Sequence, residues 1–198
     1  MGYPAPVIDG ACGRCLSGET RYDFGRAALE LSAELRELIH HFKYNDRVSL
    51  ARPLGRALQA CLDDGGFEAD FTVPVPLHPK RQRQRGYNQA ELLARRLDMP
   101  CNSKIVRRRV DTESQTGLSR NQRALNVRSA FECRGPVDGA VLIVDDVQTT
   151  GATINEVTRV LKKKGARRIE VLTLARVGVS NQELATRTDA GSRDSIVQ

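Results

Sequence analysis

With 198 residues, of which 40% are hydrophobic, the chain is long enough to bury a core without the help of a metal or of disulfides. No apolar run approaches the roughly 18 residues that a membrane-spanning helix needs, and no hydrophobic signal region opens the sequence. We therefore expect a cytoplasmic protein without a membrane anchor, and the net charge of +7 indicates an anionic partner.

The cysteines do not form the pattern of a disulfide framework, because there are five of them in a chain that is not a small secreted domain. Cys12 and Cys15 form a single Cys-x-x-Cys pair, whereas structural zinc needs four tetrahedral ligands. The pair alone is therefore an incomplete zinc site. We expect no intramolecular zinc unless Cys61, Cys101, a histidine or another subunit adds ligands.

Two helices are predicted in the first third of the chain. Apolar residues at three- and four-residue spacing predict the first over residues 29 to 44: Leu31, Leu35, Leu38, Ile39 and Phe42. The second is marked by Leu50, Leu54, Ala57, Leu58 and Cys61. His40 and His41 fall on this framework, which favours a structural or surface role over catalysis.

A predicted strand and a basic segment follow. The apolar run from Phe71 to Val75 predicts a strand, residues 78 to 88 read as a basic loop that contains Gly86, and a helix is expected to begin near Asn88. A strand, a basic glycine-containing loop and a helix make an anion site at the carboxyl end of the strand. Glutamines alternate with the bases in this loop, so we do not expect every charge to face a ligand.

The positive charge of the chain is concentrated around this loop. Between Pro76 and Arg109 ten bases stand against two acids, a net charge of +8, so the rest of the chain sums to −1. Such an excess indicates pyrophosphate, a nucleotide or a nucleic acid as partner. A solvated basic face is an equally weighted alternative for Arg95, Arg96, Lys104, Arg107, Arg108 and Arg109. Tyr87 is the only aromatic residue in this segment, so stacking of nucleic-acid bases is not strongly indicated.

Residues 111 to 128 are polar and show little apolar periodicity. A loop of this length inside a compact domain is usually functional or disordered. An amphipathic helix from Asn121 to Ser129, with Leu125 pointing inward, remains an alternative for its second half.

The most informative stretch runs from Val141 to Thr153. Val141 to Val144 predict a strand buried on both faces of a parallel sheet, and Asp145 and Asp146 follow it directly. The two carboxylates point to opposite faces if the strand continues and share a side if it turns there. Hydroxyl groups and free backbone N–H groups at the start of a helix then suit a phosphate, and this turn comprises Thr149, Thr150, Gly151, Ala152 and Thr153. The order predicts a ribose-phosphate site rather than an ordinary acidic turn after a buried strand.

The predicted helix continues to the stop at Gly165, and residues 169 to 175 read as the next strand. Residues 178 to 198 are polar, and we expect a disordered tail there.

Residues 141–153 resemble the phosphoribosyl diphosphate (PRPP) motif of type I phosphoribosyltransferases, and the whole stretch from residue 11 to 177 resembles the ComF/GntX branch of that superfamily. The other matching segments are 41–44, 50–54, 73–78, 85–89 and 115–118, with Arg123, Asn126 and Val127. The resemblance implies an α/β fold with a mostly parallel twisted sheet flanked by helices. It divides the chain into residues 1–25, a small remnant of a zinc module with one Cys-x-x-Cys pair; residues 26–177, the phosphoribosyltransferase-like domain; and the tail at 178–198.

The resemblance also assigns roles within the site. Asp145 and Asp146 would hold the ribose 2′- and 3′-hydroxyls, and residues 149 to 153 would hold the 5′-phosphate. The pyrophosphate loop would comprise Lys80, Arg81, Arg85 and Gly86, with Arg85 and Lys80 preferred as ligands and Mg²⁺ bridging diphosphate and ribose oxygens. A flexible loop that closes over the site would contribute Gln115, Arg120 and Arg123.

Two functions are implied. The first is transfer of the phosphoribosyl group from PRPP to an unknown acceptor with release of pyrophosphate. The second is a non-catalytic module that binds PRPP or ribose 5-phosphate, acts with a helicase partner in DNA uptake and contacts single-stranded DNA. Many purine-salvage members have an aspartate where this chain has Thr149, and threonine cannot act as that general base, so purine salvage is disfavoured. The acceptor and the oligomeric state stay open.

Overall fold

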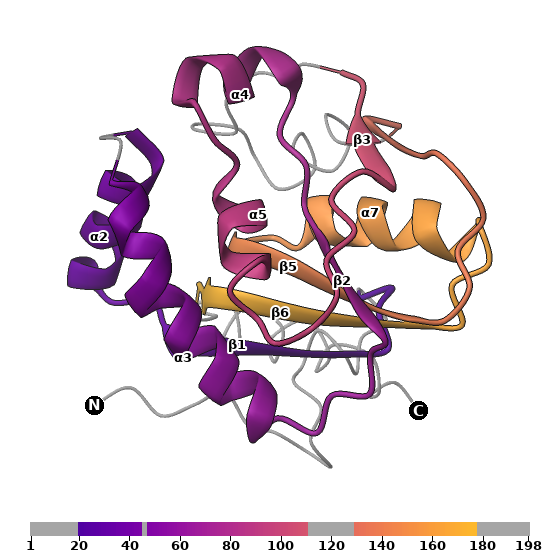
Figure 1. Ribbon diagram of the computed structural model, residues 1–198, viewed down its shortest axis with the longest axis horizontal. Coiled ribbons are helices and arrows are strands. Elements are labelled where there is room, and N and C mark those ends of the chain that lie inside the picture. Colours follow the sequence, from indigo (N-terminus) through magenta and orange to yellow (C-terminus); the bar gives the residue numbers. More distant parts are fainter. Residues whose placement is uncertain (1–19, 45–46, 111–128, 178–198) are drawn as a thin grey trace, which may run out of the picture.

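The computed structural model of the protein describes residues 20–44, 47–110 and 129–177. Its centre is a sheet of four parallel strands in the order β1-β6-β5-β2 (Figure 1). These strands are β1 (Phe24–Glu30), β2 (Phe71–Pro74), β5 (Ala140–Gln148) and β6 (Arg168–Arg176). Since parallel strands need crossover connections, helices follow three of them and cover the sheet. The expected α/β fold with a parallel sheet is confirmed.

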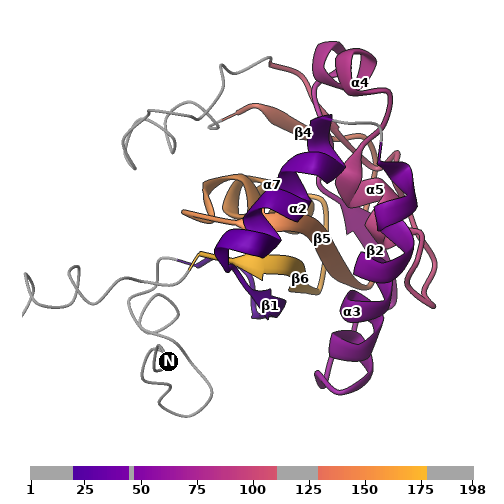
Figure 2. The same ribbon diagram turned by 90° about the vertical axis from the view of Figure 1, so that its left-hand side faces the viewer.

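Helices cover both faces of this sheet, and the alternation of side chains along β5 sorts the core into two layers (Figure 2). Val141 and Ile143 belong to the apolar cluster that includes α7 (Ala152–Lys162). Leu142 and Val144 belong to the cluster that includes α2 (Ala33–Tyr44), α3 (Ala51–Asp63) and α5 (Gln89–Ala94). All four of these β5 side chains are fully buried, which is why the strand reads as an unbroken apolar run.

Shorter elements lie beyond the sheet. Helix α4 (Pro79–Arg85) follows β2, a 3-10 turn, η1 (Val48–Leu50), precedes α3, and β3 (Val106–Arg108) pairs antiparallel with β4 (Phe131–Cys133). Figure 1 shows α4 and β3 on the same side of the molecule, above the large sheet. No helix in the described part of the chain is long and apolar enough to cross a membrane.

The predicted helix over residues 29 to 44 was wrong in its first turn. Residues 24–30 form β1, and α2 begins only at Ala33. The spacing was misleading at its start because Leu31, although it packs against the core, lies in the connection between β1 and α2. The expected domain start at residue 26 would cut this strand, and residues before it are bonded as well: the Asp23 N–H donates to the Ile169 carbonyl at 2.8 Å.

The expected basic loop over residues 78–88 was also wrong in part. Its basic residues lie on α4, whose amino terminus is capped by His78 and whose carboxyl terminus is capped by Gly86 at φ 77°. The next helix begins after Asn88, as expected, and the Asn88 side chain accepts a hydrogen bond from the Ala90 N–H at 3.1 Å. The predicted second helix and the strands at 71–75, 141–144 and 169–175 are confirmed as α3, β2, β5 and β6.

Several expectations lie outside the described residues. These are the Cys12–Cys15 pair with the remnant of the zinc module, the flexible-loop residues Gln115, Arg120 and Arg123, and the tail from residue 178. Of the alternative helix at 121–129 only Ser129 is described, and its φ of 64° is not helical.

Candidate functional site

Two neighbouring carboxyl groups lie near the carboxyl end of β5. The strand does not turn after Val144 but continues to Gln148, so Asp145 and Asp146 leave it on opposite faces. Asp146 is 8% exposed and Asp145 is half-buried. Backbone groups hold both side chains: the Asp146 N–H donates to Asp145 Oδ1 at 2.9 Å, and the Val147 N–H donates to Asp146 Oδ1 at 2.7 Å. Two oxygen-bearing side chains are thus fixed at the edge where parallel α/β sheets bind ligands.

The two carboxyl groups do not carry equal charge. Burial raises the pKa of Asp145 to about 8, and the negative charge of Asp146 beside it acts in the same direction. In the ligand-free protein Asp145 is therefore mostly protonated at pH 7. A donor that approaches the pair, such as a sugar hydroxyl, meets one carboxylate and one carboxylic acid.

Asp146 is paired with a lysine that sequence reasoning missed. Lys43 Nζ lies 2.8 Å from Asp146 Oδ2, and the two side chains are 25% and 11% exposed. Burial opposes the charge on Lys43, but Asp146 outweighs it, with help from Asp145, and raises the pKa of the ammonium group. Residues 41–44 contributed to the family resemblance, yet nothing in the sequence linked Lys43 to the aspartates about a hundred positions later.

The carboxyl end of α2, which carries Lys43, is fixed against the connection between α4 and α5. The Phe42 carbonyl accepts hydrogen bonds from Tyr87 Oη at 2.7 Å and from Gln89 Nε2 at 3.4 Å. Tyr44 Oη accepts from Arg85 Nη2 at 2.9 Å, and the Arg85 guanidinium lies 4.7 Å from the centre of the Tyr44 ring. Three segments that are distant in sequence therefore meet around Lys43.

The four residues assigned to the pyrophosphate loop do not all lie at this place. Arg85 is half-buried beside Tyr44 and Lys43, and Arg81, also half-buried, precedes it by one helical turn. Lys80 is exposed and stands about 140° around the helix from Arg85, because five residues of an α-helix span that rotation. Gly86 forms the left-handed end of α4. The structure thus brings Arg85 near Lys43, the partner of Asp146, and leaves Lys80 on another face of the helix.

The hydroxyl-rich segment forms the expected turn into a helix. Gly151 is the N-cap of α7 with φ 75°, and the Ala152 N–H lies 3.4 Å from Thr150 Oγ1. Thr149 is exposed, while Thr150, Ala152 and Thr153 are half-buried. The first turn of this 11-residue helix presents backbone N–H groups and the positive end of the helix dipole, a combination that binds phosphate.

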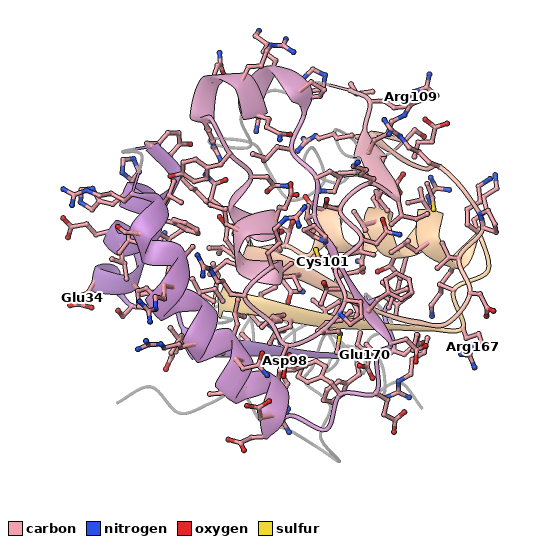
Figure 3. The ribbon with its side chains drawn as sticks, viewed as in Figure 1. Glu34, Asp98, Cys101, Arg109, Arg167 and Glu170 are labelled. Carbon is pink, nitrogen blue, oxygen red and sulfur yellow. The ribbon has the colours of Figure 1, made fainter. Side chains whose placement is uncertain are left out.

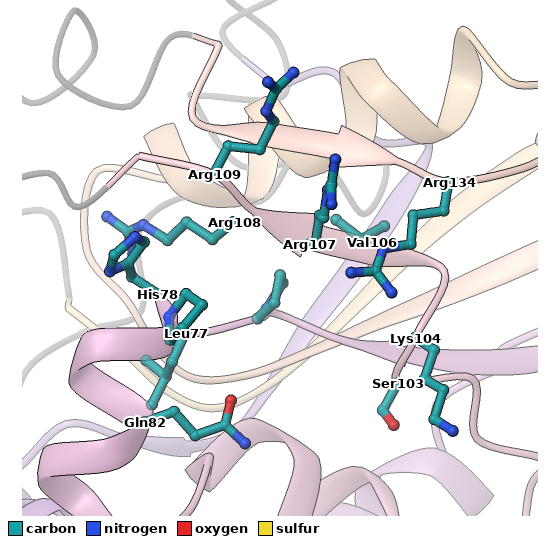
Figure 4. A pocket seen from close by; sticks show the side chains of 12 residues that line it. Leu77, His78, Gln82, Ser103, Lys104, Val106, Arg107, Arg108, Arg109 and Arg134 are labelled. Carbon is teal, nitrogen blue, oxygen red and sulfur yellow. The ribbon is translucent and has the colours of Figure 1, made fainter.

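A separate cavity of about 530 Å³ lies on the other side of α4, and Figure 4 shows its lining side chains. Gln82 and His78 border it from α4 and its cap, while Arg134 reaches it from the residues after β4. Its basic side chains are Lys104, Arg107, Arg108, Arg109 and Arg134, and its described lining includes no residue of 145–153.

Part of the basic excess is neutralised locally. Arg95 pairs with Glu91 at 2.8 Å, and Glu132 pairs with Arg107 and, at 3.8 Å, with Arg109. For Arg95 this supports the solvated-face interpretation, because such exposed pairs within one helix are ordinary surface features. Arg107 and Arg109 also line the cavity, so Glu132 neutralises part of the positive charge of the cavity.

Another buried acid, Glu170, has a structural role. It is fully buried on β6, where its oxygens accept hydrogen bonds from Arg168 Nε at 2.7 Å and from the Glu68 N–H at 2.9 Å. It lies near the start of β6 opposite Leu142, whereas Asp145 lies opposite Thr173, and Figure 3 shows it well apart from Arg109. We therefore do not include it in the site.

The residues present fit a magnesium ion that arrives with its ligand better than one held by the protein alone. In the described ranges no three His, Cys, Asp or Glu side chains form a group that could hold a metal. The oxygens of the aspartates and of the threonine turn suit a hard cation, but most of its coordination would have to come from diphosphate, ribose and water. Cys61, Cys101 and Cys133 are free thiols.

Comparison with known proteins adds the following. The phosphoribosyl transferase domain model matches residues 83–191. Competence protein F of Haemophilus influenzae is 36% identical over 178 residues, which are 83% of this chain and 78% of that protein. The DNA utilization protein YhgH of Escherichia coli is 35% identical over 185 residues, or 88% of this chain and 82% of that protein. A solved hypoxanthine phosphoribosyltransferase of Staphylococcus aureus is 16% identical with a TM-score of 0.39, covering 70% of this chain and 71% of that one.

Proposed function

Because the chain belongs to the ComF family of the type I phosphoribosyltransferase superfamily, we propose that it binds PRPP with Mg²⁺ and transfers the phosphoribosyl group to an acceptor. The observation that carries this proposal is the continuity of β5, the Asp145–Asp146 pair and the Gly151 turn into α7. It places two carboxyl groups, which can accept hydrogen bonds from hydroxyl groups, and the helix start that would bind a phosphate within residues 145–153. The cytoplasm is the proposed compartment.

In the proposed reaction a nucleophile forms a bond to the ribose C1 carbon while the bond from C1 to diphosphate breaks, and pyrophosphate leaves with the electron pair. The protein would mainly orient the ribose and neutralise the leaving group. Asp145 and Asp146 would accept hydrogen bonds from the 2′- and 3′-hydroxyls, residues 149 to 153 would hold the 5′-phosphate, and Arg85 would hold the diphosphate. Bound Mg²⁺ would supply positive charge to the diphosphate oxygens.

The acceptor is not a purine base in this proposal. Thr149 stands where many purine-specific relatives have an aspartate, and a threonine hydroxyl has no basicity near neutral pH. The incoming nucleophile would be bound by the residues around β3 and β4, which differ in chemistry from the PRPP motif.

The decisive test replaces both aspartates. The D145N/D146N variant should lose Mg²⁺-dependent PRPP binding in isothermal titration calorimetry while keeping its circular dichroism spectrum, because amides keep the shape of the side chains but lose their charge. D63N/D64N is the matched control, since it changes another tandem pair of aspartates at the end of α3. Unchanged PRPP affinity in D145N/D146N would remove the carboxylates from the site. Pyrophosphate release, assayed against bases, amines and nucleic acids, then tests transfer itself.

A second candidate function is a non-catalytic one, in which the bound PRPP or ribose 5-phosphate serves a protein that handles DNA with a helicase partner. The basic cavity beside α4 favours it, because the cavity gathers five cationic side chains, two of them paired with Glu132, away from Asp145 and Asp146. The names of the relatives, competence protein F and DNA utilization protein, point in the same direction. The two functions differ in the salt dependence of DNA affinity.

A further inference from the structure

The ion pair between Lys43 and Asp146 differs from the surface ion pairs of this protein. Lys162 and Asp23 also meet at 2.8 Å, but their side chains are 39% and 38% exposed, against 25% and 11% for Lys43 and Asp146. Removing a lysine from water costs free energy that a single carboxylate compensates only in good geometry. Lys43 is therefore a partly buried cation whose charge depends on Asp146, and such a pair is weak evidence for a purely stabilising role.

A second cation lies near Lys43. Arg85 is close enough that its positive charge works against the ammonium group. Both cations are held there by neighbours: Arg85 by Tyr44 Oη at 2.9 Å and Gln89 Oε1 at 3.3 Å, and Lys43 by Asp146. Two fixed like charges repel each other unless an anion lies between them.

Lys43 lies between the two parts of the proposed site. The aspartates mark the ribose position in the proposed complex, and α4, which carries Arg85, marks the diphosphate position. Lys43 contacts the first and neighbours the second. An ammonium group at that boundary can donate to a diphosphate oxygen while it keeps its bond to Asp146, because it has three donors.

We propose that Lys43 is a further ligand-binding residue, which joins Arg85 in holding the diphosphate group of the substrate and which Asp146 positions for that purpose. This inference rests on the proposed function and deepens it. It also gives the two aspartates separate roles. Asp145 would bind only the ribose, whereas Asp146 would bind the ribose and also position the ammonium group of Lys43. Lys43 takes the place that sequence reasoning gave to Lys80.

The test compares three ligands on the full-length protein by isothermal titration calorimetry: Mg²⁺–PRPP, inorganic pyrophosphate and ribose 5-phosphate. K43M should weaken PRPP and pyrophosphate by roughly 10- to 100-fold, the effect of losing one charge-assisted hydrogen bond, and ribose 5-phosphate by less than about threefold. K43R should recover part of the loss. K162M is the matched control, since it removes a lysine from an ion pair of equal length, and it should leave all three affinities unchanged.

The outcomes separate this inference from the proposed function. If wild-type protein binds the ligands and K43M weakens none of them, or all three equally, Lys43 is only structural and the inference is overturned. If wild-type protein binds neither PRPP nor pyrophosphate, the proposed function fails first and the inference fails with it. Should K43M not fold, K43Q keeps a polar end group and is subjected to the same comparison.

Discussion

Asp145 and Asp146 are adjacent in sequence but differ in their electrostatic surroundings. Asp146 has Lys43 at 2.8 Å, whereas no ion pair of the described residues includes Asp145. A buried carboxyl group without a cation gains more from keeping its proton than from ionising, and the pKa of Asp145 near 8 expresses this preference.

The raised pKa predicts how the stability of the ligand-free protein depends on pH. An unfolded chain releases the Asp145 proton near pH 4, whereas the folded chain keeps it until about pH 8. The folded state binds more protons between these values, so this residue lowers the free energy of unfolding as pH rises through them. D145N removes the effect, so the free energy of unfolding of D145N relative to that of wild type should rise between pH 4 and pH 9, by about 1.4 kcal/mol for each pH unit over which only the folded Asp145 holds its proton.

Urea unfolding of both proteins at pH 4, 7 and 9 measures this difference. D63N, a change at an exposed aspartate, controls for the loss of one negative charge. A gain in stability that is the same at every pH would mean that the Asp145 carboxyl group titrates normally in the folded protein.

At the residue scale, the sequence alone identified those candidate residues that lie next to one another in the chain. Asp145, Asp146 and the turn at 149–153 stand on one strand and one helix start, so a local pattern contains them all. Lys43 could not be found in this way, because only the packing of α2 against α4 and α5 brings it to Asp146. The direction of Lys80 could not be assigned from the sequence either, because it depends on residues 79–85 being helical.

At the scale of elements, the start of α7 depends on a backbone conformation that favours glycine. Gly151 has φ 75°, and a Cβ atom there would lie 3.2 Å from Gln148 Nε2. The strand ends and the helix begins within three residues, and this sharp change of direction places the first-turn N–H groups beside the carboxylates.

G151A should therefore lower the free energy of unfolding by about 1–2 kcal/mol and weaken binding of ribose 5-phosphate, because the turn that presents the backbone N–H groups is disturbed. Two control variants separate the causes. Gly66 also has a positive φ, of 68°, but a Cβ atom there would have no neighbour within 4 Å, so G66A tests the backbone strain alone. Gly135 has no positive φ, and a Cβ atom there would lie 3.9 Å from Ile105 Cδ1, so G135A tests the substitution without that strain. Urea unfolding and calorimetry of the three variants give the result. A normal ligand affinity in G151A, together with a stability loss equal to that of G66A, would make the turn structural only.

Element boundaries show where local patterns fail. The strands β2, β5 and β6 have strong apolar runs because helices cover both faces, and each was predicted. Within the described sheet, strand β1 pairs only with β6, and its Leu29 is exposed. The apolar pattern of β1 is therefore weaker than that of α2, the helix that follows it in the sequence. Helix α4 has no buried residue, which left its sequence without apolar periodicity.

At the scale of the whole molecule, positive charge is distributed over two places with different geometry. Arg85 and Lys43 lie with carboxylates in the proposed PRPP site, while Lys104 and Arg134 border the cavity on the other side of α4. A site for one small ligand and a groove for a polymer respond differently to salt, because a polymer releases condensed counterions for each phosphate that is neutralised.

If the cavity binds single-stranded DNA, the affinity for a fluorescently labelled oligonucleotide should fall steeply with salt. The slope of log K against log salt should be less steep by about 1.4 in K104A/R134A, which removes two phosphate contacts at about 0.7 each. R36A/K163A removes two exposed charges from α2 and from the end of α7 and should keep the wild-type slope. Fluorescence anisotropy at four salt concentrations measures it. Equal slopes for both double variants would show that DNA does not use this cavity.

The strand order β1-β6-β5-β2 also has a consequence for folding during translation. In the described sheet β1 pairs with β6 alone, and about 140 residues separate the two strands along the chain. Translation proceeds at about 5–20 residues per second, so the first strand waits for seconds without its neighbour. During that interval its unpaired edge can find another chain. Slow synthesis or a holdase chaperone should therefore affect the yield of this protein more than that of a fold whose early strands pair with each other.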